Sequence, residues 1–314
     1  MTAEMQGAST SQGGSPLVSI VIATNRRSAF LRPALESVVA QTYDNWEVVI
    51  VDDGSPIPEA LDDLAVEFRQ VRVVHQANRG PAIARNVGVV ATKGEFVAFL
   101  DDDDLWEPRR LESQIAGLLA NPAAVAGYCG MRSIDEYGRE VYPADQRRAA
   151  ARRDVLRREV GIFLGNLVVR RSCLDRVGGF HPAFRLAEDL DLVLRVVFDG
   201  EFDFVDEVLV DYRTHTGNVT SRRHELVRSI THVVSLHRWA ARERGDRASV
   251  RDLRASLAAN RRFAAWSAAR RARDFARRRR PDLAAAELGW GLVQGRDAFI
   301  VWPLRRLRKL GRRR

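Results

Sequence analysis

The amino-acid sequence predicts an α/β protein with a mixed, mostly parallel sheet, helices on both faces of that sheet, and a helical, basic C-terminal extension. Over the first hundred residues, short apolar runs rich in Val and Ile alternate with segments of helical spacing. Strands that alternate with helices in this way form parallel sheets covered on both faces. Beyond residue 221 the pattern is helical throughout and rich in Ala and Arg.

Each element of the first hundred residues has its own signal. The β-branched run LVSIVIAT is typical of a buried strand, and EVVIVDD is stopped by Gly54, which permits a tight turn. Pro81 suits the first turn of a helix. The predicted order is strand 17–24, helix 28–41, strand 47–53, helix 58–68, strand 71–76, helix 81–92 and strand 95–101.

The alternation of strands and helices weakens after about residue 119, and the later pattern sets the expected domain boundaries. Segments 123–135 and 165–171 predict strands, 187–200 predicts a helix, and 202–215 predicts one or two strands. Because no Gly- or Pro-rich linker separates them, we expect one continuous α/β unit. The expected organisation is a lead-in over 1–16, an α/β domain over 17–221 and a helical, Arg-rich extension over 222–314.

Charge is distributed unevenly along the chain. Residues 222–314 hold 26 Lys and Arg against 8 Asp and Glu, a net charge of +18. Residues 1–221 hold 24 against 33, a net charge of −9. An acidic body with a basic tail suggests an anionic partner.

Composition also predicts a cytoplasmic location. The two cysteines, Cys129 and Cys173, provide no disulfide framework, and we expect both to pack as small apolar residues in a reducing compartment. Residues 1–16 are rich in Gly, Ser and Gln and lack an apolar core, so we expect a disordered lead-in and no signal peptide. No run of about 18 or more apolar residues occurs, so we expect no membrane-spanning helix.

Four consecutive aspartates, residues 101–104, follow the fourth predicted strand. Hard cations such as Mg²⁺ and Mn²⁺ prefer oxygen ligands, commonly one or two carboxylates together with substrate phosphates. Alternation along the chain would place Asp101 and Asp103 on one side and Asp102 and Asp104 on the other, so that not all four can share one ion. An acidic helix cap explains the pattern equally well, and Asp104 is the best placed of the four for that role.

Two further acidic motifs lie at a strand end and at a helix start. VDDGS, which contains Asp53, offers carboxylates to a base or ribose, but it is also a good turn. AEDLDL, residues 187–192, offers a general base through Asp189, provided that this carboxylate faces a cleft. Its alternative is the acidic first turn of an amphipathic helix.

A polar loop, DYRTHTGNVTS, follows the last predicted strand. Arg213 and His215 in this loop are available for a diphosphate or, for His215, as an extra metal ligand. A lone His is more often structural. In parallel sheets, ligands bind beyond the carboxyl ends of the strands, which is where all of these polar motifs fall.

Taken together and in this order, the motifs resemble those of the family 2 glycosyltransferases with the GT-A fold. The match covers about residues 17–221. The resemblance implies a Rossmann-like sheet and transfer of a sugar, with inversion, from a nucleotide-sugar donor, assisted by Mg²⁺ or Mn²⁺. The segments that carry it run over residues 18–55, 78–106 (with ARN and DDDD), 178–196 (with AED) and 212–220 (YRTHTGNVT).

The resemblance also implies roles for single residues. Asp103 is the implied main metal ligand, with Asp101 beside it, and His215 matches a position that touches the metal or the diphosphate in some members. Asp101 and Asp102 are expected to face the metal, the ribose or the sugar. Asp189 corresponds to the catalytic base.

Three more residues are implied to bind the donor. Asp53 is similar to the residue that pairs with the nucleobase, Ala23 begins the turn near the base, and Arg85 faces the donor site. Many members read Pro-Thr-Tyr-Asn after the first strand, whereas this chain has Asn25 in place of the Tyr. That departure leaves the nucleotide open: uridine is the default, and thymidine or guanosine are the alternatives.

The C-terminal segment 298–314 combines an apolar patch containing Trp302 with seven Arg or Lys among its last ten residues. This combination fits peripheral contact with an anionic membrane, at the inner face of the cell membrane, and a lipid-linked acceptor would explain that location. A cell-surface glycan precursor as acceptor is what the family resemblance implies. A solvated helical face is the alternative. We expect no nucleic-acid partner, because stacking aromatics and known binding motifs are both missing.

Two rival functions are weaker. A nucleotidyltransferase shares the nucleotide-binding sheet and the carboxylate-bound metal, but it usually carries a Gly-rich basic loop after the first strand, and ATNRRSAF contains no Gly. A non-catalytic nucleotide-sugar-binding module does not need the intact aspartates or the Glu188-Asp189 pair.

Overall fold

Parallel strands build the first half of the sheet in the order β3-β2-β1-β4, as the alternating pattern predicts. The computed structural model describes residues 14–26, 29–215, 218 and 222–295. The predicted strands and helices of the first hundred residues are confirmed. They are β1 (Val18–Thr24), α1 (Leu31–Val39), β2 (Trp46–Asp53), α2 (Glu59–Glu67), β3 (Val71–Gln76), α3 (Pro81–Val90) and β4 (Phe96–Phe99).

The second half makes the sheet mixed. From β4 outward the order is β8-β6-β9-β5, in which β6 and β9 are parallel and the other neighbours antiparallel, with β7 paired to β6. The segment 202–215 folds as a single strand. These elements are β5 (Leu105–Trp106), β6 (Ala124–Ile134), β7 (Glu140–Tyr142), β8 (Leu167–Arg170) and β9 (Glu201–Arg213), with α4 (Arg110–Ala120), α5 (Arg152–Leu156), the 3₁₀ turn η1 (Leu164–Asn166), α6 (Arg171–Val177) and α7 (Glu188–Val196).

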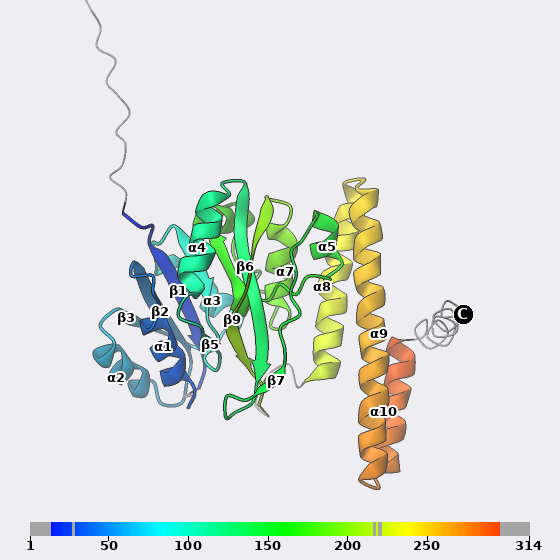
Figure 1. The fold of residues 1–314 in the computed structure, drawn as a ribbon. Coiled ribbons are helices and arrows are strands. Elements are labelled where there is room, and N and C mark those ends of the chain that lie inside the picture. The colour runs from blue at the N-terminus through cyan, green and yellow to red at the C-terminus, as the bar shows by residue number, and fades with distance from the viewer. Residues whose placement is uncertain (1–13, 27–28, 216–217, 219–221, 296–314) are drawn as a thin grey trace, which may run out of the picture.

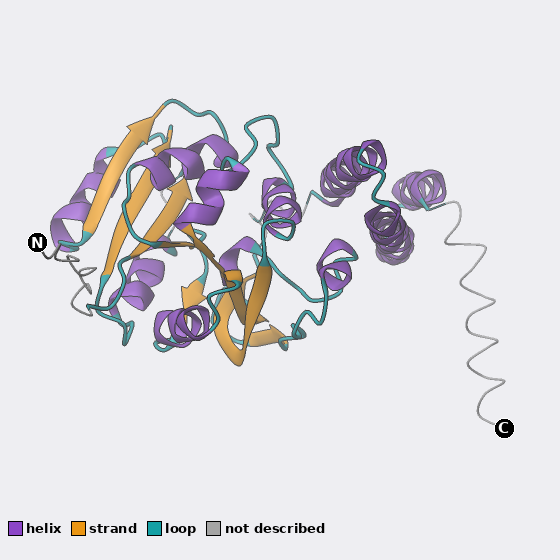
Figure 2. Cartoon of the chain, turned by 90° about the horizontal axis from the view of Figure 1, so that it is seen from above, coloured by secondary structure: helices purple, strands orange, loops and turns teal. Residues whose placement is uncertain are grey.

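Helices cover both faces of the sheet (Figure 2). Side chains of a strand alternate between faces, so Ile20 and Ile22 of β1 pack with α1 and α4 on one side, whereas Val21 packs with α3, α6 and α7 on the other. The predicted mixed α/β sheet with two covered faces is therefore confirmed. Cys129 and Cys173 are both buried with free thiols, as expected.

Three helices follow the sheet, α8 (Arg223–Glu243), α9 (Arg247–Arg277) and α10 (Pro281–Gln294). They stand beside the sheet, with α8 nearest to it and α10 outermost (Figures 1 and 2). His237 Nε2 of α8 lies 2.9 Å from Asp191 Oδ1 of α7. Within the described residues, no helix combines the length and apolarity that a membrane crossing requires. The division at 221/222 stays a prediction, and most of the lead-in lies outside the described part of the chain.

The strand order decides where polar groups gather. Because β1 lies between β2 and β4, the carboxyl ends of these strands meet at one edge. Thr24 pairs in register with Asp52, and the N–H of Leu100 donates to the carbonyl of Val21 at 3.1 Å. The turn of residues 101–104 therefore begins beside the ends of β1 and β2, which is the edge where open α/β sheets bind ligands.

Gly88 allows α3 to lie directly on β1. A Cβ at this position would come within 2.3 Å of Val21 Cγ1. We predict that Gly88→Ala lowers the free energy of unfolding by about 1–3 kcal/mol through overpacking, even though alanine is the better helix former. The control is Gly289→Ala in α10, where the new Cβ meets open space and stability should rise by up to about 1 kcal/mol. Equal urea midpoints for the two variants would contradict the prediction.

Candidate active site

The four aspartates of residues 101–104 lie in a turn, and each carboxylate has a different neighbour. The expected two-sided alternation is wrong, because β4 ends at Phe99 and the aspartates no longer belong to a strand. Instead, the turn gathers α3, β1 and the end of β9 around itself. The contacts are Arg85 Nη2 to Asp101 Oδ1 (2.8 Å), Thr24 Oγ1 to Asp102 Oδ2 (2.6 Å), His215 Nε2 to Asp103 Oδ2 (2.8 Å) and Arg213 N to Asp104 Oδ1 (2.8 Å).

Asp104 is not a helix cap, and that expectation is corrected. Strand β5 follows it directly, and α4 begins only at Arg110. Asp104 is fully buried, and its carboxylate accepts the N–H of Arg213. Burial, with Asp101 and Asp103 adding like charge, raises the pKa of Asp104 well above its usual range. The residue therefore fixes β9 to the turn from inside the protein.

Arg85 of α3 joins the turn to the start of α7. Its guanidinium donates from Nη2 to Asp101 and from Nη1 to Glu188 Oε1, the latter at 2.5 Å. Burial would lower the pKa of Arg85, but the charges of Asp101 and Glu188 outweigh it and raise that pKa. Arg85 thus lies beside the aspartate turn, with its guanidinium engaged by two protein carboxylates, and its role toward a donor stays a prediction.

Asp189 is the carboxylate of the Glu188-Asp189 pair that Arg85 does not bind. The helix starts abruptly, because Ala187 has a left-handed backbone (φ 62°) before Glu188. Asp189 Oδ1 accepts the N–H of Leu190 at 2.7 Å, and the side chain is partly exposed. Burial raises the pKa of Asp189 above its usual range. A partly accessible carboxylate of raised pKa is suited to accept a proton.

Asp103 and His215 form a largely buried pair that joins the turn to the end of β9. The Asp103 carboxylate also lies 3.6 Å from Arg26 Nη2. Burial, and then the charge of Asp101, raise the pKa of Asp103. The pKa of Asp102 is raised to about 6, mainly by burial, in spite of the hydrogen bond from Thr24. The pKa values of Asp102, Asp103 and Asp104 are thus all raised, with burial as the main cause and neighbouring carboxylates adding to it.

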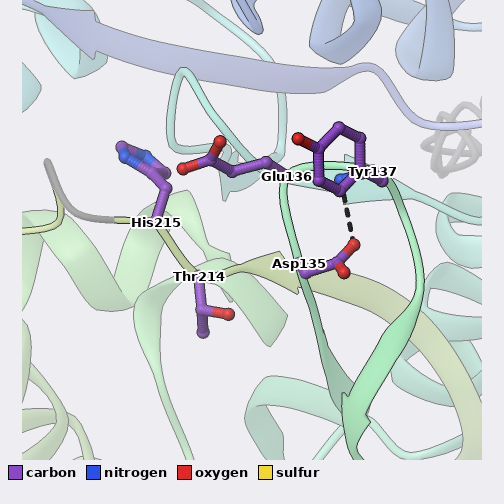
Figure 3. Close-up of a pocket in the computed structure, with 5 residues that line it drawn as sticks. All are labelled: Asp135, Glu136, Tyr137, Thr214 and His215. Atoms are coloured by element: carbon purple, nitrogen blue, oxygen red, sulfur yellow. Dashed lines mark hydrogen bonds between the residues drawn. The ribbon is translucent and has the colours of Figure 1, made fainter.

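A hollow of about 430 Å³ opens next to His215 (Figure 3). Its walls come from the end of β9 and from the turn that joins β6 to β7. The prediction from sequence missed this turn, although Asp135 and Gly138 directly after a predicted strand are a hairpin signal. The lining residues are Asp135, Glu136, Tyr137, Thr214 and His215.

Arg213 does not point to a diphosphate as its sequence position suggested. It is buried, and its Nε donates to the carbonyl of Asp103 at 2.9 Å. Its Nη1 donates to the carbonyls of Asp135 and Glu136, each at 3.2 Å. Arg213 therefore ties the hairpin at the hollow to the aspartate turn.

Asp53 and Ala23 lie at the same edge of the sheet. Asp53 accepts from Gln76 Nε2 (2.6 Å) and from the N–H groups of Arg79 (2.7 Å) and Gly80 (2.8 Å). Gly80 precedes α3 with a φ of 94°, which favours glycine. Asp53 thus holds the loop before α3, and Ala23, partly exposed, pairs in register with Val51.

We predict that Arg85→Met lowers the free energy of unfolding by about 3 kcal/mol, because it leaves the charges of Asp101 and Glu188 without their buried partner. The control is Arg32→Met, which removes the surface pair between Arg32 and Glu67. Exposed pairs contribute little, so this control should unfold close to the wild type. A loss of stability as large in Arg32→Met as in Arg85→Met, measured by urea unfolding, would sink the prediction.

Comparison with known proteins connects this geometry to a family. The model of "Glycosyl transferase family 2" matches residues 19–187. An uncharacterised glycosyltransferase of Rickettsia typhi is 30% identical over 215 residues, which is 66% of this chain and 67% of the relative. An O-antigen biosynthesis protein of Myxococcus xanthus is 35% identical over 186 residues, 58% of this chain but 14% of that protein.

Solved structures agree on the fold. A crystal structure of S. aureus TarS in complex with UDP-GlcNAc superposes with a TM-score of 0.58 at 16% identity, covering 87% of this chain and 90% of that one. The predicted GT-A fold is confirmed by this likeness. With the family model matching more than half of the sequence, the chain belongs to glycosyl transferase family 2.

Proposed function

We propose that this glycosyltransferase moves a sugar from a UDP- or dTDP-sugar to a hydroxyl group of a lipid-linked or cell-surface glycan precursor. The observation that carries the proposal is the Arg85 bridge, which holds the aspartate turn against the helix that bears Asp189. TarS structures with UDP and with UDP-GlcNAc support a uridine donor. The Myxococcus xanthus relative supports a surface-glycan acceptor.

Asp189 is the proposed catalytic base. Its carboxylate takes the proton of the acceptor hydroxyl while that oxygen attacks the anomeric carbon from the face opposite the leaving group. The bond between the anomeric carbon and the diphosphate oxygen breaks in the same step, which inverts the configuration. The transition state has oxocarbenium character, as in glycoside hydrolysis.

The donor is proposed to lie along the carboxyl edge of β2, β1 and β4. Asp53 and Ala23, at the ends of β2 and β1, are the proposed neighbours of the nucleobase. Asp101 and Asp102 are proposed to face the ribose and sugar. Arg85 orients the Asp101 carboxylate through its hydrogen bond. Asn25, in place of the usual Tyr, keeps thymidine and guanosine as alternatives to uridine.

A divalent cation, Mg²⁺ or Mn²⁺, is proposed at Asp103, with Asp101 and His215. Among the described residues, no group of three or more His, Cys, Asp or Glu side chains is already arranged as a metal site. Two of the three proposed donor atoms lie close together. Asp103 Oδ2 and His215 Nε2 are 2.8 Å apart, close to the roughly 3 Å between neighbouring ligands of an octahedral ion. When bound, the ion would neutralise charge on the departing diphosphate.

The finer statements on location are also proposals. The membrane contact expected of residues 298–314 falls outside the described residues and stays a prediction, as do the cytoplasmic location and the expectation of no nucleic-acid partner.

Screening nucleotide-sugars for slow hydrolysis with Mg²⁺ or Mn²⁺ separates the rival functions. A binding module releases no nucleoside diphosphate, and a nucleotidyltransferase releases pyrophosphate from a nucleoside triphosphate.

Asp189→Asn should lower the turnover of the nucleotide-sugar by about 10²- to 10⁴-fold, because the amide cannot accept the proton, while donor binding by calorimetry is retained. In the wild type, turnover should fall as the pH drops through the pKa of Asp189, which burial places above the usual range for Asp. Asp191→Asn is the control, because Asp191 binds Arg195 and His237 and its loss should affect stability and not the rate. Wild-type turnover by Asp189→Asn would refute the assignment.

Asp103→Asn should weaken Mn²⁺ binding in the presence of UDP by at least about tenfold, because a charged oxygen ligand is replaced by a neutral one. Binding is measured by calorimetry or by the electron paramagnetic resonance of Mn²⁺. Asp63→Asn, an exposed position in α2, provides the same chemical change away from the site. An Mn²⁺ affinity that is equal in both variants would exclude Asp103 as a ligand.

A further inference from the structure

Helix α10 presents its large aliphatic side chains to solvent. Leu288, Leu292 and Val293 are 43%, 53% and 71% exposed. A Cβ at Gly289, which is also exposed, would meet nothing within 4 Å. Along the helix only Asp282 and Glu287 are charged, and Glu287 is buried. The exposed surface of the last two turns is therefore apolar, and we call Leu288, Gly289, Leu292 and Val293 the outer face.

The inner face of α10 is made by different residues. A Cβ at Gly291 would lie 2.6 Å from the Cβ of Ala268, and one at Gly295, just beyond the helix, would lie 2.7 Å from the Cβ of Ala265. Glu287 holds the helix through His224 Nε2 and Arg271 Nε, each at 3.1 Å, and Trp290 stacks on His224. Small residues, ion pairs and one aromatic stack thus attach α10 to α8 and α9. This reverses the usual amphipathic pattern, in which the large aliphatic residues face inward.

The surroundings of the outer face are strongly basic. Residues 254–294 contain ten Arg and no Lys, against three acidic residues, Asp274, Asp282 and Glu287. Asp282 is paired with Arg280, and Glu287 with Arg271. Within the described residues, Arg277, Arg278 and Arg279 in the turn before α10 make no ion pair. The apolar outer face thus lies toward the C-terminal end of α10, and guanidinium groups without a protein counter-charge lie before its first turn, about 12 Å or more away along the helix.

We infer that the outer face of α10 and the arginines of residues 277–280 form a docking surface for an anionic lipid bilayer. Aliphatic side chains can enter the boundary between headgroups and acyl chains, while guanidinium groups bind the lipid phosphates. A second copy of the chain fits this surface less well, because the arginines of residues 277–280 would add like charge to the contact. The surface lies within the described helices and is separate from the segment 298–314.

The position of the hairpin α9–α10 is compatible with work on a membrane-held acceptor. The turn of residues 277–280 projects beyond the sheet at the end of the molecule where β7 lies (Figure 1). The hollow at His215 and Tyr137 is built by the hairpin that leads into β7. The turn of residues 277–280 and the hollow thus lie toward the same end of the molecule. A role for this arrangement in reaching an acceptor rests on the proposed function, whereas the docking surface does not.

The test compares full-length variants in sedimentation with phosphatidylglycerol-containing vesicles and with phosphatidylcholine vesicles. Leu292→Glu with Val293→Glu should weaken partitioning onto the anionic vesicles at least about tenfold, because it puts charge into the apolar contact. Val66→Glu with Val90→Glu is the matched control, since these side chains are 83% and 85% exposed on α2 and α3. A second variant, Arg277, Arg278 and Arg279→Gln, should also bind more weakly and reduce the sensitivity of binding to salt.

Every outcome decides the inference. If the Leu292/Val293 variant sediments like the wild type, the docking surface is wrong. If only Arg305, Arg306, Arg308 and Lys309→Gln abolishes sedimentation, the C-terminal segment is the sole anchor and α10 plays no part. Light scattering that shows a dimer disrupted by the Leu292/Val293 variant, without vesicle binding by the wild type, would assign the face to a second copy. UDP binding, measured in the same samples, tests the proposed function separately.

Discussion

One buried guanidinium, that of Arg85, holds two carboxylates that are 16 and 103 residues away along the chain. Asp101 belongs to the turn after β4 and Glu188 to the first turn of α7, so this cation links two elements that are far apart along the chain. One positive charge therefore faces two negative charges where solvation is reduced, which leaves a net negative charge. Asp102, Asp103 and Asp104 follow directly in the same turn.

The aspartates of the turn make contacts with different parts of the protein. Each of the four carboxylates has its own contact, and burial raises the pKa of Asp102, Asp103 and Asp104. Asp104 serves the architecture, because it fixes the main chain of β9. The other three remain at the edge where the strands end. Shifted pKa values concentrate at functional sites because such sites are arranged for a charged partner that arrives from outside.

Much of this organisation could be predicted from the sequence, and the exceptions share a cause. Periodicity located β1 to β4 and the helices between them, because each of these elements carries its own hydrophobic pattern. The order of polar motifs located the site edge for the same reason. Asp104 was misjudged because its neighbour, Arg213, lies 109 residues further on, and no local pattern records that contact. Arg213 was misjudged in the same way: a basic residue in a polar loop is expected in solvent, whereas here carbonyl groups of the β6–β7 turn surround it. The outward aliphatic residues of α10 could not be foreseen either, since a helix that is apolar all round has no pattern to show which side packs.

The hairpin at the hollow is held by hydrogen bonds to its main chain, from Arg213 and from the carboxylate of its own Asp135. Arg213 binds the carbonyl oxygens of Asp135 and Glu136, and the Asp135 carboxylate accepts the N–H groups of Tyr137 and Arg139. None of these bonds involves the side chain of Glu136 or Tyr137, and the Tyr137 ring is 81% exposed. The hydrogen bonds that shape this loop therefore do not require particular side chains at positions 136 and 137. Those two side chains can vary while the link between the hairpin and the aspartate turn through Arg213 is kept.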